Sequence, residues 1–410
     1  MKKCFNALKG MRRELLLFFI LIGVVAFANG LSDSIFSNYY KDAYDINEVQ
    51  RAFIEIPREI PGLICVLIIS ALSFIGDFRI AFIAQLLSCI GITVLGFITP
   101  SFSIMLIFLF INSLGMHLFM PLSDKIGMSL AEPDKVGVRV GQYGSVKTAV
   151  AFFTGILVFV GFYTDFFSFT TDIKWVFVIS GIGFFVAAVV AFLLVKETKK
   201  NEIVPTKTKF KFLFRKEYKY YYLLTVLHGV QKQIAYVFGS WVIVDLLLKG
   251  ADVMSLLTIA SSFLGIFFFR FVGKWLDTKG IKFMMFFDAL SFIFVYTIYG
   301  FVVLLITKEV LPDSSFLVMI IYVLFVLDRL SMQVGVVKSV YMRRIALDPS
   351  EVTRALSTGT SLDHAAAIIA AQISGLVWAY FGAHWVFFIA AFFSLGNLFV
   401  AFKIKEPKIN

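Results

Sequence analysis

The chain has 410 residues, of which 59% are hydrophobic and only 16% are charged, and it contains 49 Phe. Soluble domains have about 25% charged residues, so this composition excludes an ordinary soluble protein. The formal net charge of +11 is interpreted as a sign of membrane topology rather than of nucleic-acid binding, because cytoplasmic loops of membrane proteins collect Lys and Arg.

Long apolar segments follow one another along the whole chain. A helix needs about 20 mostly apolar residues to cross a bilayer, whereas the strands of outer-membrane barrels are alternating segments of about 10 residues. The sequence therefore predicts an all-α membrane protein with twelve transmembrane helices in two pseudo-symmetric six-helix bundles. In chain order, the predicted spans are residues 14–39, 51–76, 79–99, 102–131, 142–164, 174–195, 219–248, 253–275, 281–306, 315–346, 354–381 and 384–402.

A basic, polar segment at 196–218 lies at the middle of the chain. It predicts a cytoplasmic linker between an N-terminal bundle at 1–195 and a C-terminal bundle at 219–410. Lys and Arg concentrate in the segments on the same side as this linker, so we expect a multi-pass protein of the cytoplasmic membrane with both termini in the cytoplasm.

The two halves also resemble each other. An acid–proline pair, a basic residue and a helix start rich in Gly, Ser and Thr occur after the fourth span, from Glu132 to Arg139, and again after the tenth span, from Asp348 to Arg354. Weak similarity between two sets of six spans is typical of transporters built from repeats.

The second span begins with the unusual stretch "RAFIEIPREIPG" at residues 51–62. Arg51, Glu55 and Arg58 share one helix face, with Glu59 beside them, and this spacing predicts a ladder of opposite charges. Two prolines in the stretch remove backbone donors and favour a bend. We interpret these four charged residues as an outer gate or cavity rim, and the alternative is a solvated helix cap.

The segment Gly273-Lys-Trp-Leu-Asp277-Thr-Lys-Gly280-Ile-Lys282 lies between the eighth and ninth spans. It resembles the motif G-x-x-x-D-x-x-G-[RK]-[RK] of the major facilitator superfamily. A degenerate copy, Ser73-Phe-Ile-Gly-Asp77-Phe-Arg79, lies between the second and third spans. The resemblance implies the superfamily's two-bundle fold and a central cavity lined by the first, fourth, seventh and tenth spans.

The same resemblance implies a latch that closes the cytoplasmic side. In that role Asp77 would face the start of the eleventh span and Asp277 the start of the fifth, while Arg79 would pair with Asp124 or Glu132, and Lys282 with Asp348 or Glu351. The alternative is simple loop charge. The predicted latch residues are Asp77, Arg79, Asp124, Gly273, Asp277, Gly280 and Lys282.

Ionisable residues inside the predicted spans are the main functional signal, because each one costs about 2.5–3.5 kcal/mol or more to insert into a membrane. Candidates for binding a substrate or a proton are Asp33, His117, His228, Lys232, Asp328, Arg329, Lys338, Asp363 and His364. We expect Lys232 and Asp328 to lie on neighbouring helices. Structural ion pairs are the alternative for Asp33 and Asp328, and a hydrogen-bonded helix contact is the alternative for Asp363 and His364. Asp288 and Arg270 are interpreted as structural.

The expected function is secondary active transport of a small polar, charged or zwitterionic organic solute by alternating access, coupled to protons or another ion. The sequence contains no nucleotide-binding or metalloprotease motif, so we expect no enzyme activity, no cofactor, no bound metal and no nucleic-acid partner, and we expect a monomer in the lipid bilayer. One alternative is a proton-driven multidrug efflux antiporter. The fourth span lacks the embedded Arg followed by Gln-Gly that many proton-coupled members of the family carry, and the fifth span lacks the Gly-Pro pair typical of drug antiporters, so both absences weaken this alternative. Another is a receptor or scaffold that keeps the fold without transport.

Overall fold

The computed structural model describes residues 12–132, 136–198, 211–309, 315–349 and 351–404. The chain divides into two compact units, and the division does not follow the predicted boundary. Unit 1 contains residues 1–36 and 64–210, and unit 2 contains residues 37–63 and 211–410. Residues 37–63, which we expected in the N-terminal bundle, therefore belong to unit 2. Most of the predicted linker, residues 199–210, lies outside the described residues.

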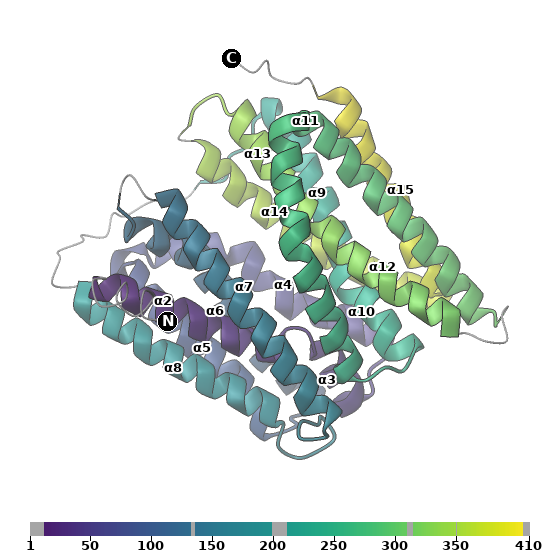
Figure 1. Cartoon of the computed structure of the whole chain (residues 1–410), viewed down its shortest axis with the longest axis horizontal. Coiled ribbons are helices and arrows are strands. Elements are labelled where there is room, and N and C mark those ends of the chain that lie inside the picture. The colour runs from purple at the N-terminus through teal and green to yellow at the C-terminus, as the bar shows by residue number, and fades with distance from the viewer. Residues whose placement is uncertain (1–11, 133–135, 199–210, 310–314, 350, 405–410) are drawn as a thin grey trace. The chain divides into compact units, whose positions relative to one another are not determined.

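Unit 1 is a bundle of long apolar helices (Figure 1). Within it α5 packs against α6 and α8, and α2 packs against α7 and α8. Its complete helices are α2 (Arg13–Ser32), α5 (Asp77–Phe97), α6 (Phe102–Ser129), α7 (Val136–Tyr163) and α8 (Trp175–Thr198).

Small residues bring the helices of unit 1 close together. A Cβ atom added at Gly91 of α5 would lie 2.5 Å from the backbone nitrogen of Asn112 on α6, and the Asn112 amide donates to the carbonyl oxygen of Ser88 at 3.2 Å. The Ser180 hydroxyl of α8 likewise donates to the carbonyl oxygen of Ala28 in α2 at 2.8 Å. Lipid cannot drive apolar helices together, so close backbone approach and interhelical hydrogen bonds stabilise such a bundle.

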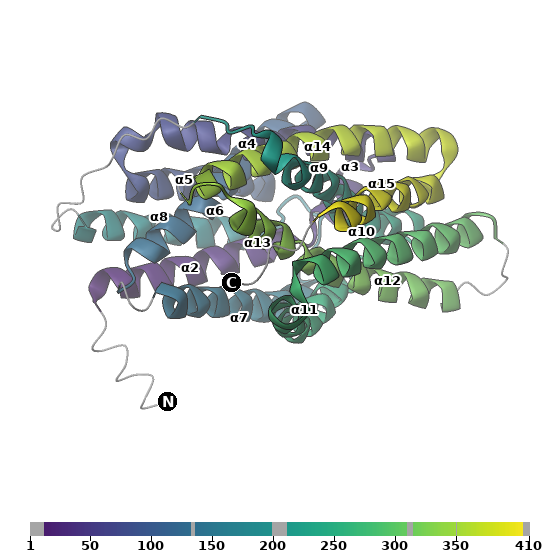
Figure 2. The ribbon, with the colours of Figure 1, turned by 90° about the horizontal axis from the view of Figure 1, so that it is seen from above.

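Unit 2 combines the C-terminal helices with α3 and the first part of α4. In Figure 2, α9 and α14 lie side by side with α15 next to them, and the second arm of α11 packs along α15. Its elements are α3 (Phe36–Tyr44, of which Phe36 belongs to unit 1), α4 (Glu48–Ala71, which passes into unit 1 after Leu63), η3 (Lys216–Tyr218), α9 (Lys219–Gln233), α11 (Ala251–Thr307), α12 (Ser315–Val334), α13 (Val336–Ile345), α14 (Glu351–Phe381) and α15 (Ala383–Lys403).

The predicted seventh span is not a regular helix. After α9, the chain forms a π-helical segment η4 (Ile234–Phe238), a short α10 (Gly239–Trp241) and a second π-helical segment η5 (Val242–Leu246). Such π-helical turns are uncommon and occur frequently at functional sites. This irregularity explains why the seventh span is absent from the helices that are long and apolar enough to cross a membrane by themselves.

Nine helices among the described residues meet that length and hydropathy requirement. Helix α4 is not one of them, and its first half carries Arg51, Glu55, Arg58 and Glu59. The predicted eighth and ninth spans are counted once, because they form the single 57-residue element α11. The all-α membrane fold is therefore confirmed, and the observed helices are consistent with twelve spans.

The two arms of α11 meet at Gly280. This residue has φ 83° and ψ 173°, a conformation outside the helical region, and Figure 1 shows α11 folding back on itself. Gly76, which precedes α5, has the similar values φ 88° and ψ 150°. Side chains other than that of Gly are strained at such angles, so glycine is required where each pair of helices turns.

Replacing Gly280 with Val is expected to destabilise the protein by about 1–3 kcal/mol, because a branched side chain is strained at positive φ. Gly273→Ala provides the control, since Gly273 is helical and a Cβ atom there would meet no atom within 4 Å. Thermal unfolding of the purified variants in detergent should show a lower midpoint for Gly280→Val alone. Equal midpoints would contradict the assigned turn.

Candidate functional site

The charged stretch that opens α4 is buried rather than solvated. Arg51 and Glu55 are each about 1% exposed. The predicted ladder is present, because Glu55 Oε1 accepts from Arg51 Nη1 at 2.6 Å and from Arg58 Nη1 at 2.8 Å. The Arg51 guanidinium also lies 5.3 Å from the centre of the Tyr40 ring on α3. A ladder of this kind fixes the face that α4 presents inside unit 2.

One turn further, Glu59 reaches into a group of charged and imidazole side chains. Its Oε2 atom lies 2.8 Å from Lys232 Nζ on α9 and 2.5 Å from His364 Nδ1 on α14. The short contact to the carboxylate indicates that His364 carries its proton on Nδ1 and donates it to Glu59. Glu59 thus takes part in the interior of unit 2, where the sequence analysis placed it only at a rim.

Asp363 is the second carboxylate of this group. Its Oδ2 atom lies 3.1 Å from Lys232 Nζ, and its Oδ1 atom accepts from His228 Nδ1 at 2.7 Å and faces Lys338 Nζ at 3.5 Å. Lys232 is therefore shared by two carboxylates. We call the whole set the charge cluster: Glu59, His228, Lys232, Lys338, Asp363 and His364.

Helix geometry explains why these side chains meet. His228 and Lys232 are four residues apart, so they share one face of α9. Gly229 allows α14 to approach that face, because a Cβ atom there would lie 2.2 Å from the carbonyl oxygen of Asp363. Gly62 does the same for α4, where an added Cβ atom would lie 2.3 Å from Cε1 of His364. Larger residues at either glycine would push the charge cluster apart.

The charge cluster is balanced while both imidazoles are neutral, with two ammonium groups and two carboxylates. Its side chains are 11–20% exposed. Buried charges are tolerated only when they are paired and hydrogen-bonded. Each charge of the cluster is therefore neutralised by its neighbours within the set.

The remaining predicted site residues lie elsewhere. Asp328 is 1% exposed in α12, and its Oδ2 atom would lie 3.6 Å from a Cβ atom added at Gly239. We expected Lys232 and Asp328 only to lie on neighbouring helices, and the partners of Lys232 are Glu59 and Asp363. Arg329 donates to the Ser240 hydroxyl at 3.1 Å and stacks on Tyr236 with its guanidinium 3.9 Å from the ring centre.

Two further candidates belong to unit 1. Asp33 is exposed at the end of α2. His117, on α6, has Nδ1 at 2.9 Å from the carbonyl oxygen of Ser113 in the preceding turn. Neither residue belongs to the charge cluster, which lies entirely in unit 2. Their binding roles remain predictions.

The cytoplasmic latch stays a prediction, and acidic residues near it form ion pairs within unit 1. Asp124 pairs with Lys147 at 3.7 Å and Glu132 with Arg139 at 3.4 Å. Asp77 pairs with Lys125 at 2.7 Å.

The turn glycines also change how the two motif copies align. Asp277 is exposed three residues before Gly280, and the matching position before Gly76 is Ser73, not Asp77. Asp77 instead begins α5. Asp77 and Asp277, which we had aligned as equivalent positions of the two motif copies, therefore occupy different places in the two turns.

Glu351, which we predicted as a partner of Lys282, contacts Arg215 in the basic segment before α9 and Tyr218 in η3. Arg215 Nε donates to Glu351 Oε1 at 3.0 Å, and the Tyr218 hydroxyl donates to Glu351 Oε2 at 2.7 Å. The hydrogen bonds to Glu351 raise the pKa of the Arg215 guanidinium above its ordinary value. Leu213 also donates its backbone N–H to the Thr358 hydroxyl at 3.0 Å. These contacts fix the beginning of α14, the helix that carries Asp363 and His364.

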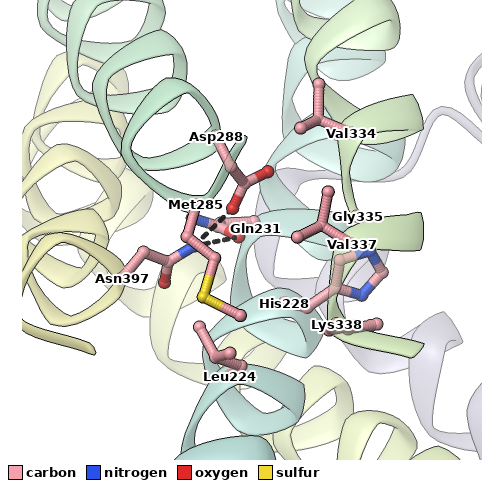
Figure 3. Close-up of a pocket in the computed structure, with 10 residues that line it drawn as sticks. All are labelled: Leu224, His228, Gln231, Met285, Asp288, Val334, Gly335, Val337, Lys338 and Asn397. Carbon is pink, nitrogen blue, oxygen red and sulfur yellow. Dashed lines mark hydrogen bonds between the residues drawn. The ribbon is translucent and has the colours of Figure 1, made fainter. Parts of the chain in front are cut away.

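A small cavity adjoins the charge cluster (Figure 3). It has a volume of about 20 Å³, and its polar lining residues are His228, Gln231, Asp288, Lys338 and Asn397. Gln231 and Asn397 were not among the predicted site residues, although an amide side chain inside an apolar span is a signal that identifies such positions. Among the described residues, no group of three or more His, Cys, Asp or Glu is arranged to hold a metal ion.

Comparison with known proteins agrees with this architecture. Residues 18–346 match the family model described as Major Facilitator Superfamily. The chain belongs to the major facilitator superfamily. It is therefore a multi-pass membrane transporter and not an enzyme. Among curated proteins no sequence matches it.

Several solved structures of transporters have a fold similar to that of this chain. The nucleoside transporter NupG is 13% identical, with 96% of this chain and 100% of that chain covered and a TM-score of 0.73. A bacterial homologue of the iron transporter ferroportin in an inward-facing state is 12% identical over 95% and 98%, with a TM-score of 0.72. A D-xylose-proton symporter is 16% identical over 96% and 98%, with a TM-score of 0.67. At these identities the likeness shows a shared fold alone.

Replacing Asp363 with Asn is expected to destabilise the protein by about 3–5 kcal/mol, because it leaves two buried lysines with one carboxylate. The matched control is Asp124→Asn, since the Asp124 side chain is 72% exposed and surface ion pairs contribute about 0–1 kcal/mol. Thermal unfolding in detergent should separate the two variants. Adding Lys338→Met to Asp363→Asn should restore part of the loss, and an Asp363→Asn variant as stable as the control would contradict the assigned pairing.

Proposed function

We propose that this transporter moves a small organic solute that carries a carboxylate or phosphate group, with or without a cationic group, and that it couples this movement to protons. The observation that carries the proposal is the position of Lys232 between Glu59 and Asp363, 2.8 Å and 3.1 Å from their oxygens. An anionic group of the solute would replace one of these carboxylates as the partner of Lys232.

Electrostatic balance supports coupling to protons. When the solute's anion takes Lys232, Glu59 loses a cation in a buried site, and an unpaired buried charge is costly. A proton taken up by Glu59 or by His364, whose Nδ1 is 2.5 Å from it, removes that cost. One proton would then enter with each negative charge, so affinity for the solute should rise as the pH falls. We place the transporter in the cytoplasmic membrane with both termini inside, as the distribution of basic residues favours.

The carboxylate on α4 also suggests how the site opens. Glu59 follows the buried ladder of Arg51, Glu55 and Arg58 on the same helix, so its release from Lys232 would free one end of a rigid charged face. We therefore propose that these four residues form a gate that opens when Lys232 changes partner.

Replacing Lys232 with Met is expected to lower transport by about 100-fold, because removing one partner of a buried charge pair costs about 2–5 kcal/mol. Thermal-shift screening with metabolites that carry carboxylate, phosphate or amino-acid groups would first identify the solute, and uptake into proteoliposomes would then measure the rate. Lys308→Met, at an exposed position beyond α11, is the control. Normal uptake by Lys232→Met would overturn the proposal. Drug export would replace it if only apolar drugs stabilised the protein and if the protein made an efflux-deficient host resistant to those drugs.

Replacing Glu59 with Gln is expected to abolish accumulation driven by a pH gradient while solute exchange between the two sides continues. The reason is that Gln still accepts a hydrogen bond from Lys232 but cannot gain or lose a proton. Uptake and counterflow in proteoliposomes separate the two activities. Proton coupling would be contradicted if wild-type uptake did not depend on the pH gradient and if the Asp33→Asn and Asp328→Asn variants were also fully active.

A further inference from the structure

The cavity of Figure 3 lies beside the charge cluster but is too small for an organic solute. Its volume of about 20 Å³ suits a single water molecule, which needs at least about 10–15 Å³ and two to four polar partners. Five polar residues line it, contributed by α9, α11, α13 and α15 (Figure 3). The cavity therefore has both the room and the polar groups that a buried water requires.

Asp288 is the carboxyl group of this cavity. Asn397 Nδ2 donates to its Oδ2 atom at 3.0 Å, and Figure 3 shows the other carboxyl oxygen turned away from that contact. This second oxygen, Oδ1, is buried and accepts no hydrogen bond from the described residues, and the same holds for Oδ1 of Asn397, a residue only 3% exposed. No Lys, Arg or His of the described chain forms an ion pair with Asp288.

The groups that face Asp288 decide what the cavity can hold. Lys338 from α13 and His228 from α9 line it, α15 contributes the neutral Asn397, and Tyr296 lies two turns further along α11. The lysine disfavours a metal cation, and the carboxyl group disfavours an anion. A water molecule and an exchangeable proton fit this mixed lining, because a buried carboxylate without an ion pair is more stable when it is protonated.

His228 connects this cavity to the charge cluster. Its Nδ1 atom donates to Asp363 at 2.7 Å, while its Nε2 atom lies 2.9 Å from the position that a Cβ atom would take at Gly335, on the cavity wall. Imidazole can accept a proton on one nitrogen and release one from the other. One ring nitrogen thus contacts Asp363, and the other lies next to Gly335 in the lining of the cavity.

We propose that Asp288 is a second proton-holding group of the transporter, connected to Asp363 through a cavity water and His228. In the transfer, the Asp288 carboxyl group gives its proton to the water, the water gives a proton to His228 Nε2, and His228 gives its Nδ1 proton to Asp363. Asp288 becomes a carboxylate and Asp363 a carboxylic acid, so charge and atoms balance. This inference deepens the proposed proton coupling and rests on it.

Infrared spectroscopy of the reconstituted full-length protein tests the site with the proton alone, without any solute. The wild type should show a protonated-carboxyl C=O band that disappears as the pH is raised and that shifts in D2O. The difference spectrum between the wild type and Asp288→Asn should show the loss of this band, and the comparison is needed because the buried Asp328 of α12 can contribute a band of its own. Asp252→Asn, an aspartate in the first turn of the same helix as Asp288, should keep the band that Asp288→Asn loses.

Two further variants keep Asp288 and change its neighbours, so they test the assignment even if Asp288→Asn does not fold. Asn397→Leu removes the donor to Asp288 Oδ2, so the band should move to higher frequency while still titrating. Lys338→Met removes a nearby cation, so the band should persist to higher pH. An Asp288→Asn spectrum that lacks no band of the wild type, or a band that does not change in either of the other variants, would overturn the assignment. Failure of solute uptake would instead count against the proposed function and leave the infrared result unchanged.

Discussion

The sharing of one buried ammonium group by two carboxylates determines the arrangement of unit 2. Lys232 on α9 contacts Glu59 on α4 and Asp363 on α14, and no one of these charges would be tolerated alone in an apolar helix bundle. The partners come from helices that are far apart in the sequence, so their pairing ties the segment 37–63 to the C-terminal helices. Under the proposed function, a group that changes the charge of one member would change the partners of the others.

Glycine makes this electrostatic arrangement possible. The approach of α14 to α9 depends on Gly229, and the approach of α4 to His364 depends on Gly62. Without a side chain at these positions, helix backbones come close enough for short side chains such as Asp363 to reach a lysine on the next helix. Close packing and charge pairing are therefore two parts of one constraint in this bundle.

The proline-containing stretch at the beginning of α4 shows how one motif can serve two purposes. Arg51 and Glu55 are almost completely buried and form a stable ladder with Arg58, while Glu59 leaves that ladder for Lys232 and His364. A solvated cap would have left these groups exposed. The stretch instead extends from a buried charged face to a carboxylate that contacts α9 and α14.

The sequence by itself determined the membrane class, the helical fold, the approximate spans and the ladder within α4, because these depend on hydropathy and on neighbours three or four residues apart. It also identified five of the six members of the charge cluster as buried ionisable residues. Only the tertiary structure decided that Lys232 pairs with Glu59 and Asp363 and not with Asp328, that Glu351 is held by Arg215, and that Ser73 matches Asp277. These pairings depend on helix rotation and on close approach at individual glycines, which a pattern along one chain does not specify. Asp288 and Asn397 became notable for the same reason, since a cavity exists only once several helices have packed around it.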